Sequence, residues 1–219
     1  MSQSIAAIVF DLDGTLVDSL DDLATALGAA LVEHGLAPAS RDTVRGWIGG
    51  GARNMVARAA PHARDAVLAR FHHYYAASPV AQTRLYPGVP EVLDHFVAFG
   101  ITLAILTNKP HPLALRIATA LLESWPFAVV SGERPGLPLK PNPDGALQIA
   151  AELGISPARC ALVGDTAIDI ATARAAGMLP VAVTWGFRPR AELVAASPAI
   201  LVDTPAELRR LTSIASEIA

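Results

Sequence analysis

Short apolar segments alternate with helical segments along most of this 219-residue chain, and the alternation strongly limits the folds open to it. The apolar segments cover residues 6–10, 102–107, 127–131, 160–164, 180–185 and 199–202. The helical patterns cover about 89–99, 112–123, 143–153, 168–176 and 190–196, and a last one begins near 205. Because parallel strands buried on both faces have such uninterrupted apolar sequences, the pattern predicts an α/β fold with a parallel sheet.

One stretch, from Ser19 to about Leu85, breaks this alternation because it contains no convincing strand. Leucine and alanine recur at helical spacing after Ser19, and Ser19 with Asp22 three residues later has the form of a capping box. Two further helical patterns cover about 41–59 and 63–77. We therefore expect an all-helical insertion after the first strand, with hinges near 15–18 and 86–88.

Charge and composition argue against several other classes of protein. The net charge is −3, so no basic surface favours nucleic acid as a partner. Cys160 is the only cysteine, which excludes an internal disulfide and a cysteine-based zinc cluster and is expected of a reducing cytosol. The longest apolar stretch, 97–106, contains Gly100 and is too short to cross a bilayer, and the first residues lack the basic region of a signal peptide. We therefore expect a cytoplasmic protein without a membrane partner.

Polar side chains follow the predicted strands at the points where the strands end. The first strand is followed by "DLDGT", the second by "TNK" and the fourth by "GDTAID", while "LKPNP" precedes a helical segment. Because the carboxyl ends of parallel strands meet at one edge of a sheet, these motifs should gather at that edge. The residues so collected are Asp11, Asp13, Thr107, Asn108, Lys140, Asp165 and Asp169. Four carboxylates facing one lysine repel one another unless a divalent cation joins them, and such oxygen ligands suit Mg²⁺.

This set of residues has the parts that phosphoryl transfer needs. Asp11, at the end of the first strand, can attack phosphorus and form an aspartyl phosphate. Asp13, two residues later, can protonate the leaving oxygen and then deprotonate the hydrolytic water. Thr107 and Lys140 offer a hydroxyl and an ammonium group to the transferring phosphoryl group. The residues therefore predict a Mg²⁺-dependent enzyme that acts on a phosphate ester.

The motifs "DLDGTLVDS", "ILTNK", "LKPNP" and "VGDTAIDIATARAAG" resemble, in type and order, the four motifs of the haloacid dehalogenase superfamily of Mg²⁺-dependent phosphatases. The resemblance implies a Rossmann-like, doubly wound core formed by residues 1–15 and 87–219, with a mobile helical cap at 16–86. It also implies Asp11 as the nucleophile and Asp13 as the acid/base. Metal binding would involve Asp11, Asp165, Asp169 and the backbone carbonyl of Asp13.

The substrate is predicted from weaker features. The segments "VRGWIGGGARNMVARA" and "VAVTWGFRPRAEL" resemble the phosphoglycolate phosphatase subgroup, which makes 2-phosphoglycolate the first candidate among small phosphorylated metabolites. Substrate binding would fall to Thr107, Asn108 and Lys140, together with Arg53 in the insertion. Arginine can hold a carboxylate through two hydrogen bonds. However, Arg53 also resembles the cap arginine with which β-phosphoglucomutases bind a substrate phosphate.

Several alternatives therefore stay open at this point. A sugar-phosphate mutase similar to β-phosphoglucomutase shares every core residue, and only the cap separates it from a hydrolase. A phosphatase of sugar phosphates, nucleotides or pyrophosphate is equally compatible with the core motifs. A signalling receiver is disfavoured, because it places adjacent acids after its first strand and has no helical insertion. A dehalogenase is disfavoured, because it needs neither Asp13 nor a metal-binding acid at Asp165. The sequence does not distinguish a monomer from a homodimer.

Overall fold

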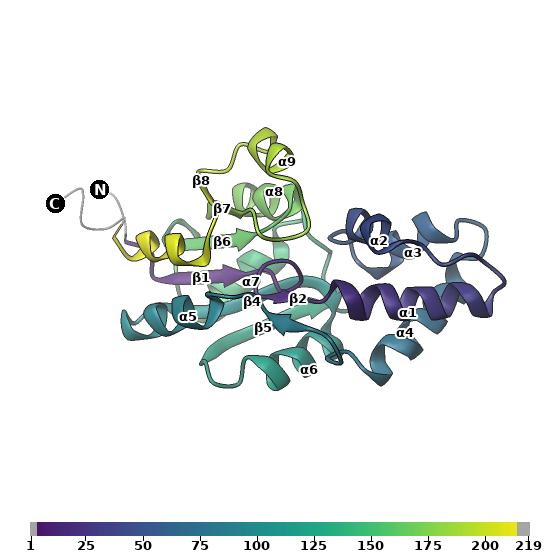
Figure 1. Cartoon of the computed structure of the whole chain (residues 1–219). Coiled ribbons are helices and arrows are strands. Elements are labelled where there is room, and N and C mark those ends of the chain that lie inside the picture. Colours follow the sequence, from purple (N-terminus) through teal and green to yellow (C-terminus); the bar gives the residue numbers. More distant parts are fainter. Residues whose placement is uncertain (1–3, 214–219) are drawn as a thin grey trace.

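A six-stranded parallel sheet forms the centre of the larger lobe in the computed structural model, which describes residues 4–213 (Figure 1). The strand order is β5-β4-β1-β6-β7-β8. The strands are β1 (Ala7–Phe10), β4 (Thr102–Pro110), β5 (Phe127–Glu133), β6 (Cys160–Gly164), β7 (Leu179–Val183) and β8 (Ile200–Val202). Each neighbouring pair is parallel, and the strand nearest the N-terminus lies in the middle of the sheet. The predicted α/β fold with a parallel sheet is confirmed.

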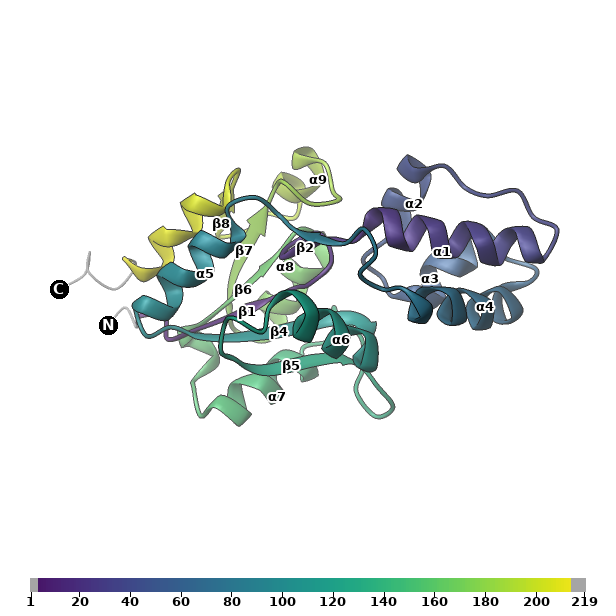
Figure 2. The same ribbon diagram turned by 60° about the horizontal axis from the view of Figure 1, so that its bottom comes forward.

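Helices cover both faces of this sheet, because successive side chains of a strand point to opposite sides. In β1, Ile8 and Phe10 belong to one apolar cluster and Ala7 and Val9 to another. The first face is covered by α5 (Val89–Ala98), α6 (His111–Leu121) and the 3₁₀ helix η2 (Pro205–Thr212). The second face is covered by α7 (Asp144–Leu153), α8 (Ala167–Ala175) and α9 (Arg190–Ala195), and a short 3₁₀ helix, η1 (Pro157–Arg159), precedes β6 (Figure 2). The last predicted helix is therefore a 3₁₀ helix where it is described, and its remainder lies outside the described residues.

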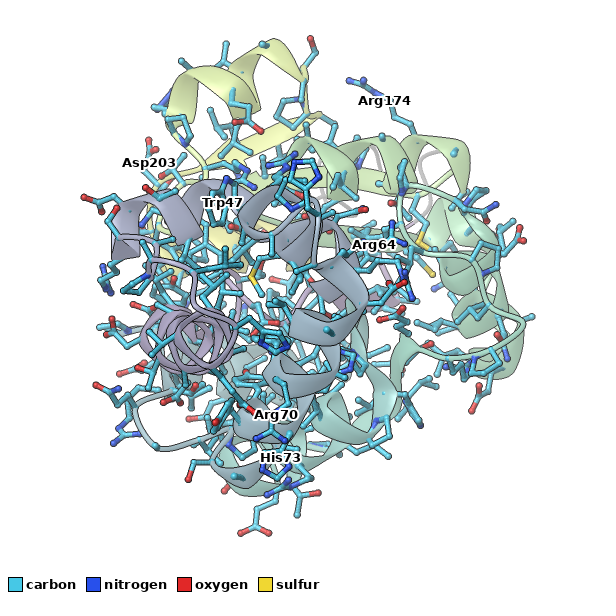
Figure 3. All side chains as sticks on the ribbon, turned by 90° about the vertical axis from the view of Figure 1, so that its right-hand side faces the viewer. Trp47, Arg64, Arg70, His73, Arg174 and Asp203 are labelled. Atoms are coloured by element: carbon cyan, nitrogen blue, oxygen red, sulfur yellow. The ribbon has the colours of Figure 1, made fainter. Side chains whose placement is uncertain are left out.

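The helical unit is the second lobe, and it lies beyond the carboxyl ends of the strands (Figures 1 and 2). It comprises α1 (Leu20–Glu33), α2 (Arg41–Trp47), α3 (Ala52–Ala59) and α4 (Arg64–Ala77), which share an apolar cluster. An ion pair of 2.7 Å between Arg70 Nε and Glu33 Oε2 joins α4 to α1, and Figure 3 shows Arg70 on the side of this unit that faces the viewer. Among the described residues, no helix is long and apolar enough to cross a membrane.

A glycine-rich loop divides the segment for which the sequence predicted one helical pattern over 41–59. Gly49 and Gly51 have φ angles of +113° and +85°, in the left-handed region that interrupts an α-helix. Two helices, α2 and α3, therefore replace the single predicted pattern. The loop between them approaches the sheet, where the Gly49 carbonyl accepts a hydrogen bond of 3.1 Å from the Asn108 side chain.

Two short strands, which the sequence did not predict, join the lobes. β2 (Val17–Asp18) pairs with β3 (Arg84–Leu85) in an antiparallel ribbon, so the chain enters and leaves the helical unit side by side. The predicted capping box at the start of α1 is wrong. The Ser19 hydroxyl donates instead to Asp13 Oδ1 at 2.5 Å, and the buried Asp22 carboxylate accepts hydrogen bonds from Gln82 and Thr83. Ser19 and Asp22 therefore form hydrogen bonds with residues outside α1 and do not cap the helix.

Candidate active site

Three carboxylates and one lysine meet at the edge of the sheet that faces the helical unit. Asp11 directly follows β1, Asp165 directly follows β6, and Asp169 lies in the first turn of α8. One oxygen of each carboxylate lies within 4.8 Å of the others. Lys140, in the loop between β5 and α7, brings its Nζ to 2.9 Å from Asp11 Oδ1 and 2.6 Å from Asp169 Oδ1. Residues from three separate motifs therefore form one cluster.

Burial dominates the electrostatics of this cluster. It raises the pKa of Asp11 to about 6, although the neighbouring Lys140 acts in the opposite direction. Burial, and then the charges of Asp11 and Asp169, raise the pKa of Asp165 well above its usual range. Burial alone would lower the pKa of Lys140, but the Asp11 and Asp169 carboxylates raise it, so the ammonium group stays charged. The cluster therefore has too little positive charge for its three acids.

Hydrogen bonds hold two of these acids in fixed orientations. Asp165 Oδ2 accepts the Phe187 N–H at 2.7 Å, and its Oδ1 accepts the Thr15 hydroxyl at 3.3 Å. Asp169 Oδ2 accepts the Thr166 N–H at 3.1 Å and the Thr166 hydroxyl at 2.6 Å in the capping box of α8. A side chain at Gly186 would collide with the Asp165 side chain, so the backbone approaches this carboxylate closely. The acids are preorganised rather than free to turn away from one another.

The donor set fits a divalent cation. Its members are buried carboxylate oxygens, which are the ligands that hard cations prefer. Within residues 4–213, Asp11 Oδ1 has an ionic contact with Lys140 but no aligned hydrogen bond, so this buried oxygen keeps its capacity to bind a cation. Among the described residues, Asp11, Asp165 and Asp169 therefore form a carboxylate group that could hold a metal ion.

Asp13 lies outside the cluster and has its own partners. Lys109 Nζ lies 2.7 Å and 2.9 Å from the two Asp13 oxygens, and the Ser19 hydroxyl also donates to this carboxylate. Lys109 Nζ donates a further bond of 2.8 Å to the Tyr75 hydroxyl on α4. The sequence analysis did not select Lys109 or Tyr75, although Lys109 is the third residue of the "TNK" motif. The helical pattern around Tyr75 indicates only that it lies on a helix, and nothing in the sequence shows that its hydroxyl reaches Lys109.

Thr107 and Asn108 lie inside β4, which runs three residues further than the predicted strand. Both side chains are buried, and Thr107 Oγ1 accepts the Lys109 N–H at 3.3 Å. The Asn108 amide donates to the carbonyls of Gly49 and Lys140, both at 3.1 Å, and its oxygen accepts the Lys140 N–H at 2.8 Å. Asn108 therefore joins the sheet to the Lys140 loop and to the helical unit. Substrate binding by Thr107 and Asn108 stays a prediction.

A cavity of about 50 Å³ lies between the two lobes. The sheet side of its wall is polar and the side formed by the helical unit is mostly apolar. The lining includes Asp11, Asp13, Thr107, Asn108 and Lys109 from the sheet side, and Leu23, Ile48, Ala52, Met55, Phe71 and Tyr75 from the helical unit. Arg53 does not line it. Its side chain is 57% exposed, and its Nη1 lies 2.9 Å from Asp65 Oδ1. Substrate binding by Arg53 also stays a prediction.

Fold and site together define a doubly wound α/β protein with a buried acidic cluster, compatible with metal binding, beneath a helical unit. The chain matches the haloacid dehalogenase-like hydrolase family over residues 5–177. It is 34% identical to phosphoglycolate phosphatase 1 of Pseudomonas aeruginosa, covering 96% of this chain and 81% of that protein. It is 33% identical to the phosphoglycolate phosphatase of Haemophilus influenzae strain 86-028NP, covering 95% and 98% of the two chains.

A solved structure agrees with these relatives. The crystal structure of a predicted phosphoglycolate phosphatase from Haemophilus somnus superposes with a TM-score of 0.88 at 32% identity, covering 96% of this chain and 99% of that one. The family match alone spans well over half of the chain. This chain belongs to the haloacid dehalogenase-like hydrolase family.

Proposed function

We propose that the chain is a Mg²⁺-dependent phosphoric monoester hydrolase whose substrate is 2-phosphoglycolate. The observation that carries the proposal is the buried cluster of Asp11, Asp165, Asp169 and Lys140 beside the cavity. The two phosphoglycolate phosphatases that resemble the chain over nearly its whole length support the choice of substrate.

Asp11 is the nucleophile of the proposed reaction. One of its oxygens forms a bond to phosphorus while the bond between phosphorus and the ester oxygen breaks, which leaves an aspartyl phosphate. Asp13 gives its proton to the departing ester oxygen. It then removes a proton from a water molecule, which attacks phosphorus and releases Asp11 and inorganic phosphate. Lys109 and Ser19, which bond to Asp13, fix the orientation of its carboxylate.

Positive charge and hydrogen-bond donors complete the proposed site. Lys140 Nζ, already 2.9 Å from Asp11 Oδ1, donates to an oxygen of the transferring phosphoryl group, as does the Thr107 hydroxyl. Mg²⁺ would be held by Asp11, Asp165 and Asp169 and by the backbone carbonyl of Asp13. When bound, it supplies charge that offsets the repulsion between the Asp11 carboxylate and the phosphate dianion.

In this proposal the helical unit, residues 16–86, is a cap that closes over the core formed by residues 1–15 and 87–219. Its apolar side chains exclude water from the reacting groups. Contacts between the lobes support the idea: Asn108 bonds to Gly49, and Arg188 in the loop after β7 donates to the carbonyls of Arg45 and Ile48. Closing and opening of the cap would admit the substrate and release glycolate.

Phosphate release from a panel of phosphorylated metabolites, measured with and without Mg²⁺, tests the function. We expect turnover of 2-phosphoglycolate that a chelator abolishes and Mg²⁺ restores, whereas Ca²⁺, which accepts more ligands, should not support it. Interconversion of sugar phosphates without release of phosphate would instead indicate a mutase. Full activity in the chelator would contradict the metal requirement.

Replacement of the nucleophile tests the mechanism. Asp11→Asn should lower the rate by about 10³-fold or more, because the covalent step is lost while the side chain keeps its size. Asp144→Asn, in the exposed first turn of α7, is the matched control and should keep the wild-type rate. Retention of a tenth of the wild-type rate by Asp11→Asn would rule out the assignment.

A further inference from the structure

We propose that Lys109 and Tyr75 form the subsite that binds the carboxylate of the substrate. The inference rests on the proposed function, since it takes 2-phosphoglycolate as the substrate and Asp13 as the group that protonates the leaving oxygen. It assigns to a residue of β4 and a residue of α4 the role that the sequence predicted for Arg53. The argument starts from the position of the Lys109 ammonium group.

The chemistry of 2-phosphoglycolate requires the two binding groups to be neighbours. Its leaving oxygen and its carboxylate are attached to the same carbon atom. A side chain that bonds to the leaving oxygen must therefore lie next to the side chain that binds the carboxylate. Lys109 Nζ lies 2.7 Å and 2.9 Å from the two oxygens of Asp13 and lines the same cavity, so it meets this requirement.

The Tyr75 hydroxyl has a proton to give. It accepts a hydrogen bond of 2.8 Å from Lys109 Nζ, but it donates to no residue in the described part of the chain. Its side chain is only 2% exposed, so water reaches it poorly, and buried hydroxyl groups normally find an acceptor. Burial raises the pKa of Tyr75 to about 12, so the hydroxyl stays protonated at neutral pH. A carboxylate in the cavity supplies the missing acceptor.

The Lys109 ammonium group can serve a second carboxylate without leaving the first. Two of its three N–H donors go to the two oxygens of one carboxylate, that of Asp13, and the third goes to Tyr75. Turning one donor to the substrate still leaves Lys109 paired with Asp13. The substrate carboxylate would receive one charged and one neutral hydrogen bond.

Other cations near the cavity are occupied or distant. Lys140 is bound to Asp11 and Asp169, and Arg53 is bound to Asp65 at an exposed position outside the cavity wall. The part of the wall that the helical unit contributes is mostly apolar. A single ammonium group against an apolar wall favours a small acid over an uncharged alcohol, because an unpaired polar group in such a site is costly.

The position of the subsite also connects recognition with closure. Lys109 belongs to the core sheet and Tyr75 to the helical unit, so both donors face one ligand only when the lobes are in contact, as they are here. A carboxylate bound by both residues therefore stabilises the closed arrangement. A phosphate ester without that carboxylate gains no such stabilisation, and its turnover should be slower.

The test compares two substrates in the full-length enzyme. One is 2-phosphoglycolate, and the other is 2-hydroxyethyl phosphate, in which an alcohol replaces the carboxylate. The measured quantity is the ratio of their kcat/KM values, in which losses that act through Asp13 on both substrates cancel. We expect Tyr75→Phe to lower this ratio by roughly 10-fold and Lys109→Met by roughly 100-fold, as the loss of one hydrogen bond and of one charged group to a carboxylate predicts.

Tyr74→Phe is the matched control. Tyr74 is the preceding residue on α4, but its hydroxyl donates to Glu33 at 2.8 Å on the outside of the helical unit, so the ratio should not change. An unchanged ratio in Tyr75→Phe and Lys109→Met, or a loss confined to Arg53→Ala, would overturn the subsite while leaving the proposed function intact. If the wild-type enzyme does not hydrolyse 2-phosphoglycolate, the proposed function itself fails. If Lys109→Met does not fold, Tyr75→Phe, which removes one oxygen atom, decides alone.

Discussion

Asp22 should contribute more to stability than any exposed acid on α1, because its carboxylate joins the start of the helical unit to the segment that leaves it. Asp22 is 5% exposed. Its Oδ2 accepts the Thr83 N–H at 2.8 Å and the Thr83 hydroxyl at 2.7 Å, and both of its oxygens lie 3.0 Å from the Gln82 nitrogen. Removing this side chain therefore leaves several donors without their acceptor.

The magnitude follows from which donors can find another partner. In Asp22→Ala the Thr83 hydroxyl can still donate to the Pro79 carbonyl, 3.3 Å away, and the Gln82 N–H is partly accessible to water. The Thr83 N–H cannot find another acceptor in water, since Thr83 is 0% exposed. One unpaired buried donor and the lost hydrogen bonds to a charged acceptor should together lower the free energy of unfolding by about 3 kcal/mol. Asp22→Asn keeps one acceptor oxygen and should cost about half as much.

Urea unfolding, followed by far-ultraviolet circular dichroism and tryptophan fluorescence, measures the effect. The matched control is Asp21→Ala, which removes an exposed ion pair with Arg41 and should cost less than about 1 kcal/mol. A cost for Asp22→Ala within 1 kcal/mol of that control would refute the reasoning. It would mean that the contacts of Asp22 with Gln82 and Thr83 do not hold the start of the helical unit to the segment that leaves it.

Two further predictions concern the contact between the lobes and the lone thiol. Arg188→Ala removes the donors to the Arg45 and Ile48 carbonyls. Steady-state kinetics should show the KM for 2-phosphoglycolate rising by roughly 3- to 10-fold, with a smaller change in kcat. An unchanged KM would show that this contact does not aid closure of the cap. Burial raises the pKa of the Cys160 thiol, so the thiolate fraction at pH 7.5 is smaller than that of free cysteine. The reaction of Cys160 with Ellman's reagent should be at least about tenfold slower than that of free cysteine. It should accelerate only at higher pH, and it should become fast when urea unfolds the protein. Rapid reaction of the folded protein would contradict this prediction.

Two acids of the cluster could be predicted because their positions follow from a rule of local sequence. A residue directly after a buried parallel strand lies at one known edge of the sheet, and this applies to Asp11 and Asp165. The strand segments themselves are nearly free of polar residues, so their ends are easy to locate. The fold class and the convergence of the motifs required no other information.

Other features depend on partners that are distant in the sequence. The partner of Asp13 is Lys109, 96 positions later, and nothing in the "TNK" motif shows that its lysine turns back to the first loop. Ser19 and Asp22 have the spacing of a capping box, but their tertiary partners bind them more favourably than the helix end does. The exposed position of Arg53 likewise depends on how α3 packs, which helical periodicity does not determine.

The central position of β1 also has a consequence for how the protein is made. Ala7 pairs with Thr102 on one side and with Cys160 on the other, so this apolar strand has no partner until almost half of the chain has been synthesised, and its second partner comes much later. The helices between residues 20 and 77 contact one another across shorter separations in sequence, so we expect them to fold before β1 has a partner strand. An incomplete chain therefore exposes an unpaired apolar segment that favours aggregation and capture by chaperones. The residue proposed to attack phosphorus becomes ordered only when the ribosome has supplied the strands that flank it.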